Sequence, residues 1–124
     1  MNDNVRDILN SGKRDKMEII AAIVAMTQKP SKITILMDKM NLSHPMLKKY
    51  MKLMLKLRLI ESLEVVTKAN EKGQVFQSTE KGLIFLTTYC DILRIVYGED
   101  FLQQANNLAI TCLKYCKTAE STQE

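Results

Sequence analysis

The stretch SHPMLKKYMKLMLKLR, residues 43–58, predicts an amphipathic helix that has one apolar and one basic stripe. The apolar stripe recurs at helical spacing and consists of Leu47, Met51, Met54 and Leu55. The basic stripe lies beside it and consists of Lys48, Lys49, Lys52 and Lys56. Like charges at this spacing repel each other by roughly a few tenths of a kcal/mol per pair, and a phosphate backbone would relieve that repulsion. The helix is therefore a candidate for DNA recognition, with a solvated lysine face as the alternative.

The residues before this helix predict two further helices. A helix over residues 13–28 is apolar on most sides, which indicates a central and buried position, and Pro30 ends it. Ser31 is expected to cap a short helix that runs to about residue 40. Asn41 tolerates the left-handed conformation that ends a helix, and Ser43 then caps the basic helix with Pro45 in its first turn. Two short helices joined by a tight turn are typical of a helix-turn-helix.

The residues after Arg58 change period and predict a β-hairpin. Residues 59–66 contain partly alternating and β-branched side chains, which indicate a strand. Residues 67–73, TKANEKG, form a polar turn, and residues 74–79 return as a second strand. A hairpin directly after a basic helix is expected to be the wing of a winged helix. Thr79 is a candidate cap for the helix that follows.

The C-terminal segment, residues 80–117, carries a heptad-like apolar seam. Its members step by three or four residues and begin at Leu83; those expected at a dimer contact are Leu86, Cys90, Leu93, Tyr97, Phe101, Ala105, Leu108, Cys112 and Tyr115. A continuous helix of this length would span roughly 50 Å, more than a small domain needs, so the seam predicts a helix of a second copy of the chain as its partner. Gly98 leaves two alternatives open, a helix with altered winding or a break into two helices. The seam also leaves parallel and antiparallel pairing open.

Charge is distributed unevenly over the 124 residues. Residues 1–60 carry twelve Lys and Arg against five acidic residues, a net of +7, whereas residues 61–124 carry a net of −3. The first half is therefore expected to meet an anionic partner. No segment combines an apolar face with aromatic anchors and a basic rim or reaches transmembrane length, so no membrane partner is predicted. The polar start argues against a signal peptide, and three cysteines without metal-type clustering fit a reducing cytoplasm.

Three stretches of the chain resemble a small archaeal winged-helix family of chromatin and transcription proteins, the Sulfolobus ten-a type. They are RDKMEIIAAI at residues 14–23, KPSKITILMDKMNLSHPMLKKYMKLMLKLRLIE at residues 29–61 and STEKGLIFLTTY at residues 78–89. The resemblance covers roughly residues 13–97. It implies a dimer formed through the C-terminal helix and double-stranded DNA bound by the paired winged domains. It also implies that residues 43–52 approach the major groove and that residues 68–73 form the wing tip.

The expected fold is mainly α with a β-hairpin wing. A winged helix-turn-helix at residues 13–79 is followed, at residues 80–117, by an antiparallel coiled-coil dimerisation helix or helix pair. Flexible termini are expected at residues 1–12 and 118–124. The residues predicted to contact DNA lie on the basic helix, next to it and on the wing: Lys32, Ser43, His44, Lys48, Lys49, Lys52, Lys68 and Lys72.

The residue inventory argues against an enzyme. His44 is the only histidine, so a catalytic triad is not easily built, and the acidic residues form no defensible general acid–base pair. No phosphate loop, metal site, cofactor or small-molecule ligand is predicted. The expected function is a homodimeric, nucleoid-associated DNA-binding protein that regulates transcription. There are two alternatives: a non-specific architectural chromatin protein, and a winged-helix module that binds an acidic protein. The absence of Arg, Asn and Gln from the basic face favours the architectural protein.

Overall fold

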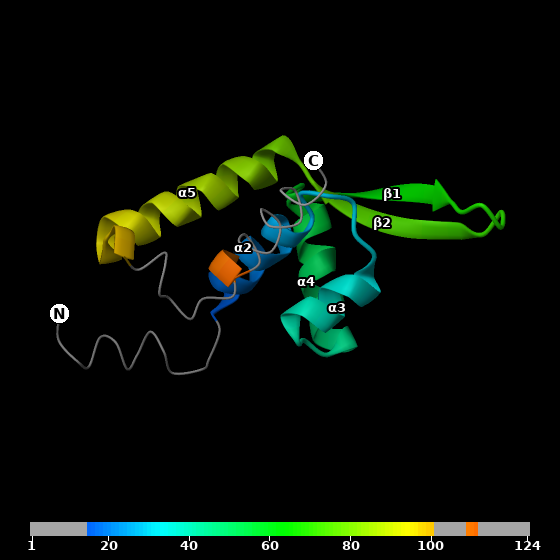
Figure 1. The fold of residues 1–124 in the computed structure, drawn as a ribbon, viewed down its shortest axis with the longest axis horizontal. Helices are drawn as coiled ribbons and strands as arrows, with labels where there is room; N and C mark the ends of the chain where they lie inside the picture. Colours follow the sequence, from blue (N-terminus) through cyan, green and yellow to red (C-terminus); the bar gives the residue numbers. More distant parts are fainter. Residues whose placement is uncertain (1–14, 101–108, 112–124) are drawn as a thin grey trace.

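The computed structural model describes residues 15–100 and 109–111 of the chain (Figure 1). The order of elements is α2 (Lys16–Met26), α3 (Ile33–Met40), α4 (His44–Lys56), β1 (Ile60–Val66), β2 (Lys72–Ser78) and α5 (Glu80–Tyr97). The hairpin formed by β1 and β2 projects away from the helices, and α5 lies across α2. A helix-turn-helix with a two-stranded wing, predicted from the sequence, is confirmed.

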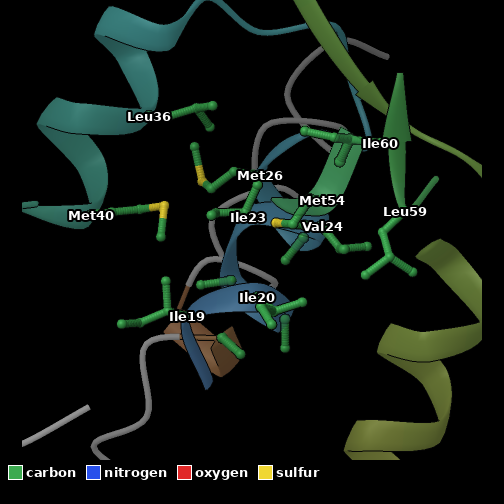
Figure 2. Close-up of a cluster of buried hydrophobic side chains, with 14 of the residues drawn as sticks. Ile19, Ile20, Ile23, Val24, Met26, Leu36, Met40, Met54, Leu59 and Ile60 are labelled. Atoms are coloured by element: carbon green, nitrogen blue, oxygen red, sulfur yellow. The ribbon is translucent and has the colours of Figure 1, made fainter. Parts of the chain in front are cut away.

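Helix α2 is the centre of the hydrophobic core. The Asp15 side chain caps the helix by accepting a 2.7 Å hydrogen bond from the backbone N–H of Glu18. Every residue from position 19 to position 26 is buried, as expected for a helix that is apolar on all sides. Figure 2 shows side chains of α3, α4 and β1 pointing at this helix, among them Leu36, Met54 and Ile60.

The turn between α3 and α4 is built as the sequence predicts. Asn41 takes the left-handed conformation, with φ of 53°, and its N–H donates to the carbonyl oxygen of Met37. The Ser43 hydroxyl then caps α4 by accepting a 3.3 Å hydrogen bond from the backbone N–H of Met46. These two local signals set the direction in which α4 leaves α3.

Ser31 does not cap α3, contrary to the sequence prediction. Lys32 occupies the N-cap position and makes no side-chain capping bond. Ser31 instead pairs with Phe76 of β2, with hydrogen bonds of 3.0 Å and 2.8 Å in the two directions. Ser31 thus forms an isolated β-bridge with the wing, and this long-range pairing overrides the local preference for a cap.

The wing is an antiparallel pair in which Val66 faces Lys72 and Ile60 faces Ser78. Its return strand begins at Lys72, two residues earlier than position 74 expected from the sequence. A five-residue connection joins the strands, and Asn70 supplies the left-handed conformation there, with φ of 61°. At the base of the wing, Ser78 donates its backbone N–H to the carbonyl oxygen of Thr27 at 2.7 Å, which ties β2 to the end of α2.

Helix α5 ends at Tyr97, so the structure shows the break that the sequence left open as an alternative. Gly98 follows with φ of 89°, a conformation that favours glycine, and its N–H donates to the carbonyl oxygen of Arg94. A single helix over residues 80–117, the basis of the predicted long coiled coil, is therefore wrong. Ala109 belongs to the same buried cluster as α2, so the chain returns to the domain after α5 (Figure 1).

The predicted segment boundary at residue 79 falls on the N-cap of α5, where the Thr79 hydroxyl accepts from the N–H of Gly82 at 3.1 Å. Leu86 of α5 nevertheless joins the core around α2. The predicted flexible termini, residues 1–12 and 118–124, lie outside the described residues. Within the described part of the chain, no helix is both long and apolar enough to cross a membrane.

Candidate nucleic-acid interface

The four lysines of α4 lie exposed along one flank of the helix, which we call the basic flank: Lys48, Lys49, Lys52 and Lys56. The helix is held in this orientation because Leu47, Met51 and Met54 on its other side are buried in the core. Helix α4 contains no acidic residue. No described side chain makes a hydrogen bond or an ion pair with any of the four ammonium groups, so no acidic partner within the described residues offsets the charge of the flank.

A groove of about 580 Å³ separates the basic flank from the wing. Its apolar residues come from α3, α4 and β2 and include Ile33, Met51, Leu55 and Phe76. Lys48, Lys49 and Lys52 form its rim on the α4 side, and Gln74 stands on the wing side. The structure therefore brings three of the predicted DNA-contacting lysines together around one concave surface.

The remaining predicted contacts near α4 are exposed and close to that groove in the chain. His44 is the first residue of α4, and Lys32 immediately precedes the groove residue Ile33. The Ser43 oxygen is already engaged as the cap of α4, so the hydroxyl proton is the group that it can offer to a phosphate. Ser43 and His44 lie at the N-terminus of α4, where the helix dipole also favours an anion, and Lys32 lies at the N-terminus of α3.

The two predicted wing residues are less favourably placed to bind phosphate than the lysines of the basic flank. Lys68 lies in the turn at the tip of the wing, and Lys72 begins β2. Both are exposed, but Glu71 precedes Lys72, and Glu64 lies diagonally across the strand pair from it. With Glu61 also on β1, the wing carries more acidic than basic residues, so its attraction for phosphate is weaker than that of the basic flank.

Sequence reasoning missed an apolar strip next to the basic flank. Met46, Leu53 and Leu57 are spaced by seven and four residues and are each exposed by more than two fifths. Spacing of this kind places them on one side of α4, clear of the lysines. The spacing of Met46, Leu53 and Leu57 can be seen in the sequence. It was overlooked because Leu47, Met51 and Met54 already explained how one side of the helix packs against the core.

The residues predicted at a dimer contact are divided between the core and the part of the chain that is not described. Leu86 and Leu93 are buried, Cys90 is partly buried and packs against the core, and Tyr97 is partly buried. The apolar side chains of Leu86, Cys90 and Leu93 are therefore packed within the domain itself. The rest lie outside the described residues: Phe101, Ala105, Leu108, Cys112 and Tyr115.

Helix α5 carries a second face, rich in isoleucine, that the sequence analysis did not single out. Ile84, Thr88, Ile92 and Ile95 follow one another by four, four and three residues, and we call them the solvent stripe. Ile95 is 81% exposed and Ile84 is 61% exposed. Val96 beside them is exposed to the same extent as Ile84. An apolar surface that runs along one helix in this way is typical of an interaction site.

The described residues hold no group of His, Cys, Asp or Glu side chains that could bind a metal ion. Cys90 is the cysteine that lies among them, and Cys112 and Cys116 fall outside. The basic flank and the groove beside it therefore offer a partner ammonium groups, the imidazole of His44 and apolar side chains.

Comparison with protein families finds one match that covers most of the chain. The model of a family described as winged helix-turn-helix matches residues 13–96, which include every described helix and strand up to the last turn of α5. No curated protein matches the chain, and no solved structure does. The match ends two residues before Gly98, where the structure ends α5.

Proposed function

The chain belongs to the winged helix-turn-helix family, and from this premise we propose that it binds double-stranded DNA through the basic flank of α4. The observation that supports this proposal most directly is the set of four exposed lysines on a helix without an acidic residue. Neutralising phosphates with these side chains releases counterions, which is the main source of affinity in such complexes.

In the proposed complex, the N-terminal half of α4 lies in the major groove. Lys48, Lys49 and Lys52 contact phosphates, and His44 and Ser43 meet the backbone or a base edge at the helix start. Lys32 adds a contact from the neighbouring helix. Lys68 and Lys72 on the wing reach the flanking backbone and contribute less, because the wing also carries glutamates.

We propose a transcription regulator, and one observation favours an architectural chromatin protein as the second candidate. The exposed basic face of α4 contains lysine but no Arg, Asn or Gln, the side chains that read base edges best. Such a surface binds phosphate with little regard to sequence. Competition between a selected site and random duplex DNA separates the two: a ratio of about 10³ or more supports the regulator, and a ratio near one supports the architectural protein.

The family model does not test the narrower resemblance to the archaeal ten-a type, which remains a prediction. We also propose that the protein is nucleoid-associated in the cytoplasm, that it has a binding role without catalysis, and that it uses no cofactor. These proposals follow from the DNA-binding surface and from the residue inventory.

We further propose that the protein acts as a homodimer, with the solvent stripe of α5 as the contact. The stripe is apolar, lies on the opposite side of α5 from Leu86 and Leu93, and presents Ile84, Ile92 and Ile95 to solvent. Pairing two such helices would remove these isoleucines from water, which stabilises a dimer by about 25 cal/mol for each Å² of apolar surface buried. A dimer would present two basic flanks to one duplex.

The proposed DNA binding is tested by the fluorescence anisotropy of a labelled random duplex, titrated with the full chain over a salt series. We expect log K to fall linearly with log salt concentration, with a slope of about −0.9 for each phosphate contacted. If each α4 makes at least three such contacts, the slope is about −3 per protomer or steeper. Absence of binding at low salt would contradict the proposal and favour an acidic protein as the partner of the basic flank.

A further inference from the structure

The groove between α4 and the wing has the size and the lining of a small-molecule site. Its volume of about 580 Å³ falls within the range of about 300–1,000 Å³ that holds drug-sized ligands. Side chains from three elements line it, namely Ile33 of α3, Met51 and Leu55 of α4, and Phe76 of β2. Phe76 is held in place because its backbone pairs with Ser31 on one side and with Ser62 of β1 on the other.

A phosphate backbone alone does not account for this lining. Phosphate and sugar oxygens need donors, whereas Ile33, Leu55 and Phe76 offer none. An apolar body in contact with these side chains would gain free energy in proportion to the area that it removes from water. Ile33 and Leu55 are the partly exposed members of this lining, whereas Met51 and Phe76 are 3% and 6% exposed and form the closed base beneath them.

The rim determines the charge of the ligand. Lys48, Lys49 and Lys52 line the groove, and no acidic side chain does. Their ammonium groups make no hydrogen bond or ion pair with any described residue, so they can turn toward an anion while their methylene stems cover an apolar body. Gln74 offers an amide on the opposite wall, where its Nε2 donates to the Ser62 hydroxyl.

We propose that this groove binds an amphipathic organic anion, with the apolar body on the floor and the acid group among the three lysines. The second part of the proposal rests on the proposed DNA binding: the ligand and DNA use the same lysines, so each lowers the affinity of the protein for the other. The sequence pattern does not indicate such a ligand, because Ile33 and Phe76 are far apart in the chain and come together only in the fold.

The ligand site is tested with two fluorescent probes that share an aromatic body, anilinonaphthalene sulfonate and the uncharged phenylnaphthylamine. Both are titrated into the full chain in the absence of DNA. We expect the sulfonate to bind about tenfold more tightly, and replacing both Lys48 and Lys52 by Met to remove this difference by weakening sulfonate binding about two- to fivefold per lysine. Lys56→Met is the matched control, because Lys56 belongs to the basic flank but does not line the groove, and it should leave both affinities unchanged.

A second variant tests the apolar floor without changing charge. Gln74→Trp places a large side chain at the mouth of the groove, on an exposed strand position that accepts aromatic residues. We expect both probes to lose at least fivefold in affinity, with circular dichroism unchanged. Three results would each overturn the ligand site and place the probe elsewhere, such as on the solvent stripe. The first is that the two probes bind the wild type with equal affinity, and the second is that Lys56→Met weakens sulfonate binding as much as the replacement of Lys48 and Lys52 does. The third is that Gln74→Trp leaves the binding of both probes unchanged.

Competition is tested by adding the sulfonate to the complex with a labelled duplex. We expect the apparent Kd for DNA to rise in proportion to probe concentration once the groove is saturated, and Gln74→Trp to suppress this rise. Release of DNA supports the coupling, and an unchanged Kd at saturation overturns it. If the protein binds no DNA at low salt, the proposed function fails, while the probe titrations still decide the ligand site.

Discussion

Gly82 lies where the first turn of α5 meets the backbone that follows α4. A Cβ at this position would overlap the carbonyl oxygen of Leu59, and the neighbouring backbone cannot move freely to make room. Thr79 fixes the same crossing, because its hydroxyl donates to the carbonyl oxygen of Arg58 at 2.6 Å and its backbone N–H donates to the carbonyl oxygen of Leu59 at 3.0 Å. This is the physical reason for glycine in the TEKG motif, residues 79–82.

We predict that Gly82→Ala destabilises the protein. The steric overlap costs about 3 kcal/mol, the upper part of the range for overpacking, and outweighs the gain of up to about 1 kcal/mol that Ala brings to a helix. The free energy of unfolding from urea denaturation should therefore fall by about 2 kcal/mol. Gly73→Ala is the matched control, since its Cβ would lie 3.4 Å from the nearest side-chain atom of Val65, and its unfolding midpoint should barely move. Equal midpoints for both variants would contradict this account of Gly82.

We also predict that the turn between α3 and α4 depends on the left-handed conformation of Asn41, whose φ is 53°. Asn41→Val should lower the free energy of unfolding by about 1–2 kcal/mol, because a β-branched side chain is strained there. Asn41→Gly relieves that strain and should stay close to the wild type. Thermal or urea denaturation of the two variants measures the difference, and a valine variant as stable as the glycine variant would show that the turn tolerates another conformation.

At the scale of elements, α4 and the wing differ in how much charge they offer to DNA. We predict that Lys52→Ala reduces the slope of log K against log salt concentration by about one unit, because one phosphate contact is lost. Lys68→Ala at the wing tip should reduce it by less, since Glu71 and Glu64 lower the positive potential there. Lys16→Ala, at the start of α2 and outside both the basic flank and the wing, is the control and should leave the slope unchanged. A larger effect of Lys68 than of Lys52 would shift the interface to the wing.

The helix-turn-helix and the wing could be predicted because their signals are local. Asn41 marks the end of α3, and Ser43 and Pro45 mark the start of α4. The apolar spacing of α4 identifies its core-facing side. Ser31 was predicted wrongly because its backbone pairs with Phe76, and no local pattern reveals a partner so distant in the chain. The groove was missed for the same reason, since Ile33 and Phe76 become neighbours only after the wing folds back.

The prediction for α5 erred in a different way. The predicted seam from Leu86 to Tyr97 follows one face of α5, and its spacing does not say whether that face packs on the core of its own chain or on a second copy. In the structure Leu86 and Leu93 face the core, whereas Ile84 and Ile95 face solvent. Gly98 was recognised as a candidate break, and its φ of 89° shows why the helix stops there.

At the scale of the whole molecule, the basic flank and the solvent stripe lie on different elements, α4 and α5. This separation allows one copy to hold DNA and a second copy at the same time. Ala109 belongs to the same buried cluster as α2, so the described residues 109–111 contribute to the core of the domain.

We predict that replacing Ile92 and Ile95 together by Glu abolishes self-association while the fold is retained. Buried carboxylates at a helix contact are strongly unfavourable, and both side chains are already exposed in the single copy, so the core is untouched. Sedimentation equilibrium should give a dimer for the wild type and a monomer for the double variant. Val66→Glu, at an apolar wing position that is 65% exposed, is the control and should remain dimeric. A wild type that stays monomeric at high concentration would contradict the dimer.

DNA binding through the basic flank is tested by the anisotropy of a labelled duplex at low salt with the double charge reversal Lys48→Glu and Lys52→Glu. Both side chains are exposed and unpaired among the described residues, so the variant should fold as the wild type does. Lys16→Glu supplies a single reversal outside the interface as the control. We predict that binding is lost in the double variant and kept in Lys16→Glu. Binding that survives the double reversal with an unchanged salt slope would contradict the assignment of DNA to α4.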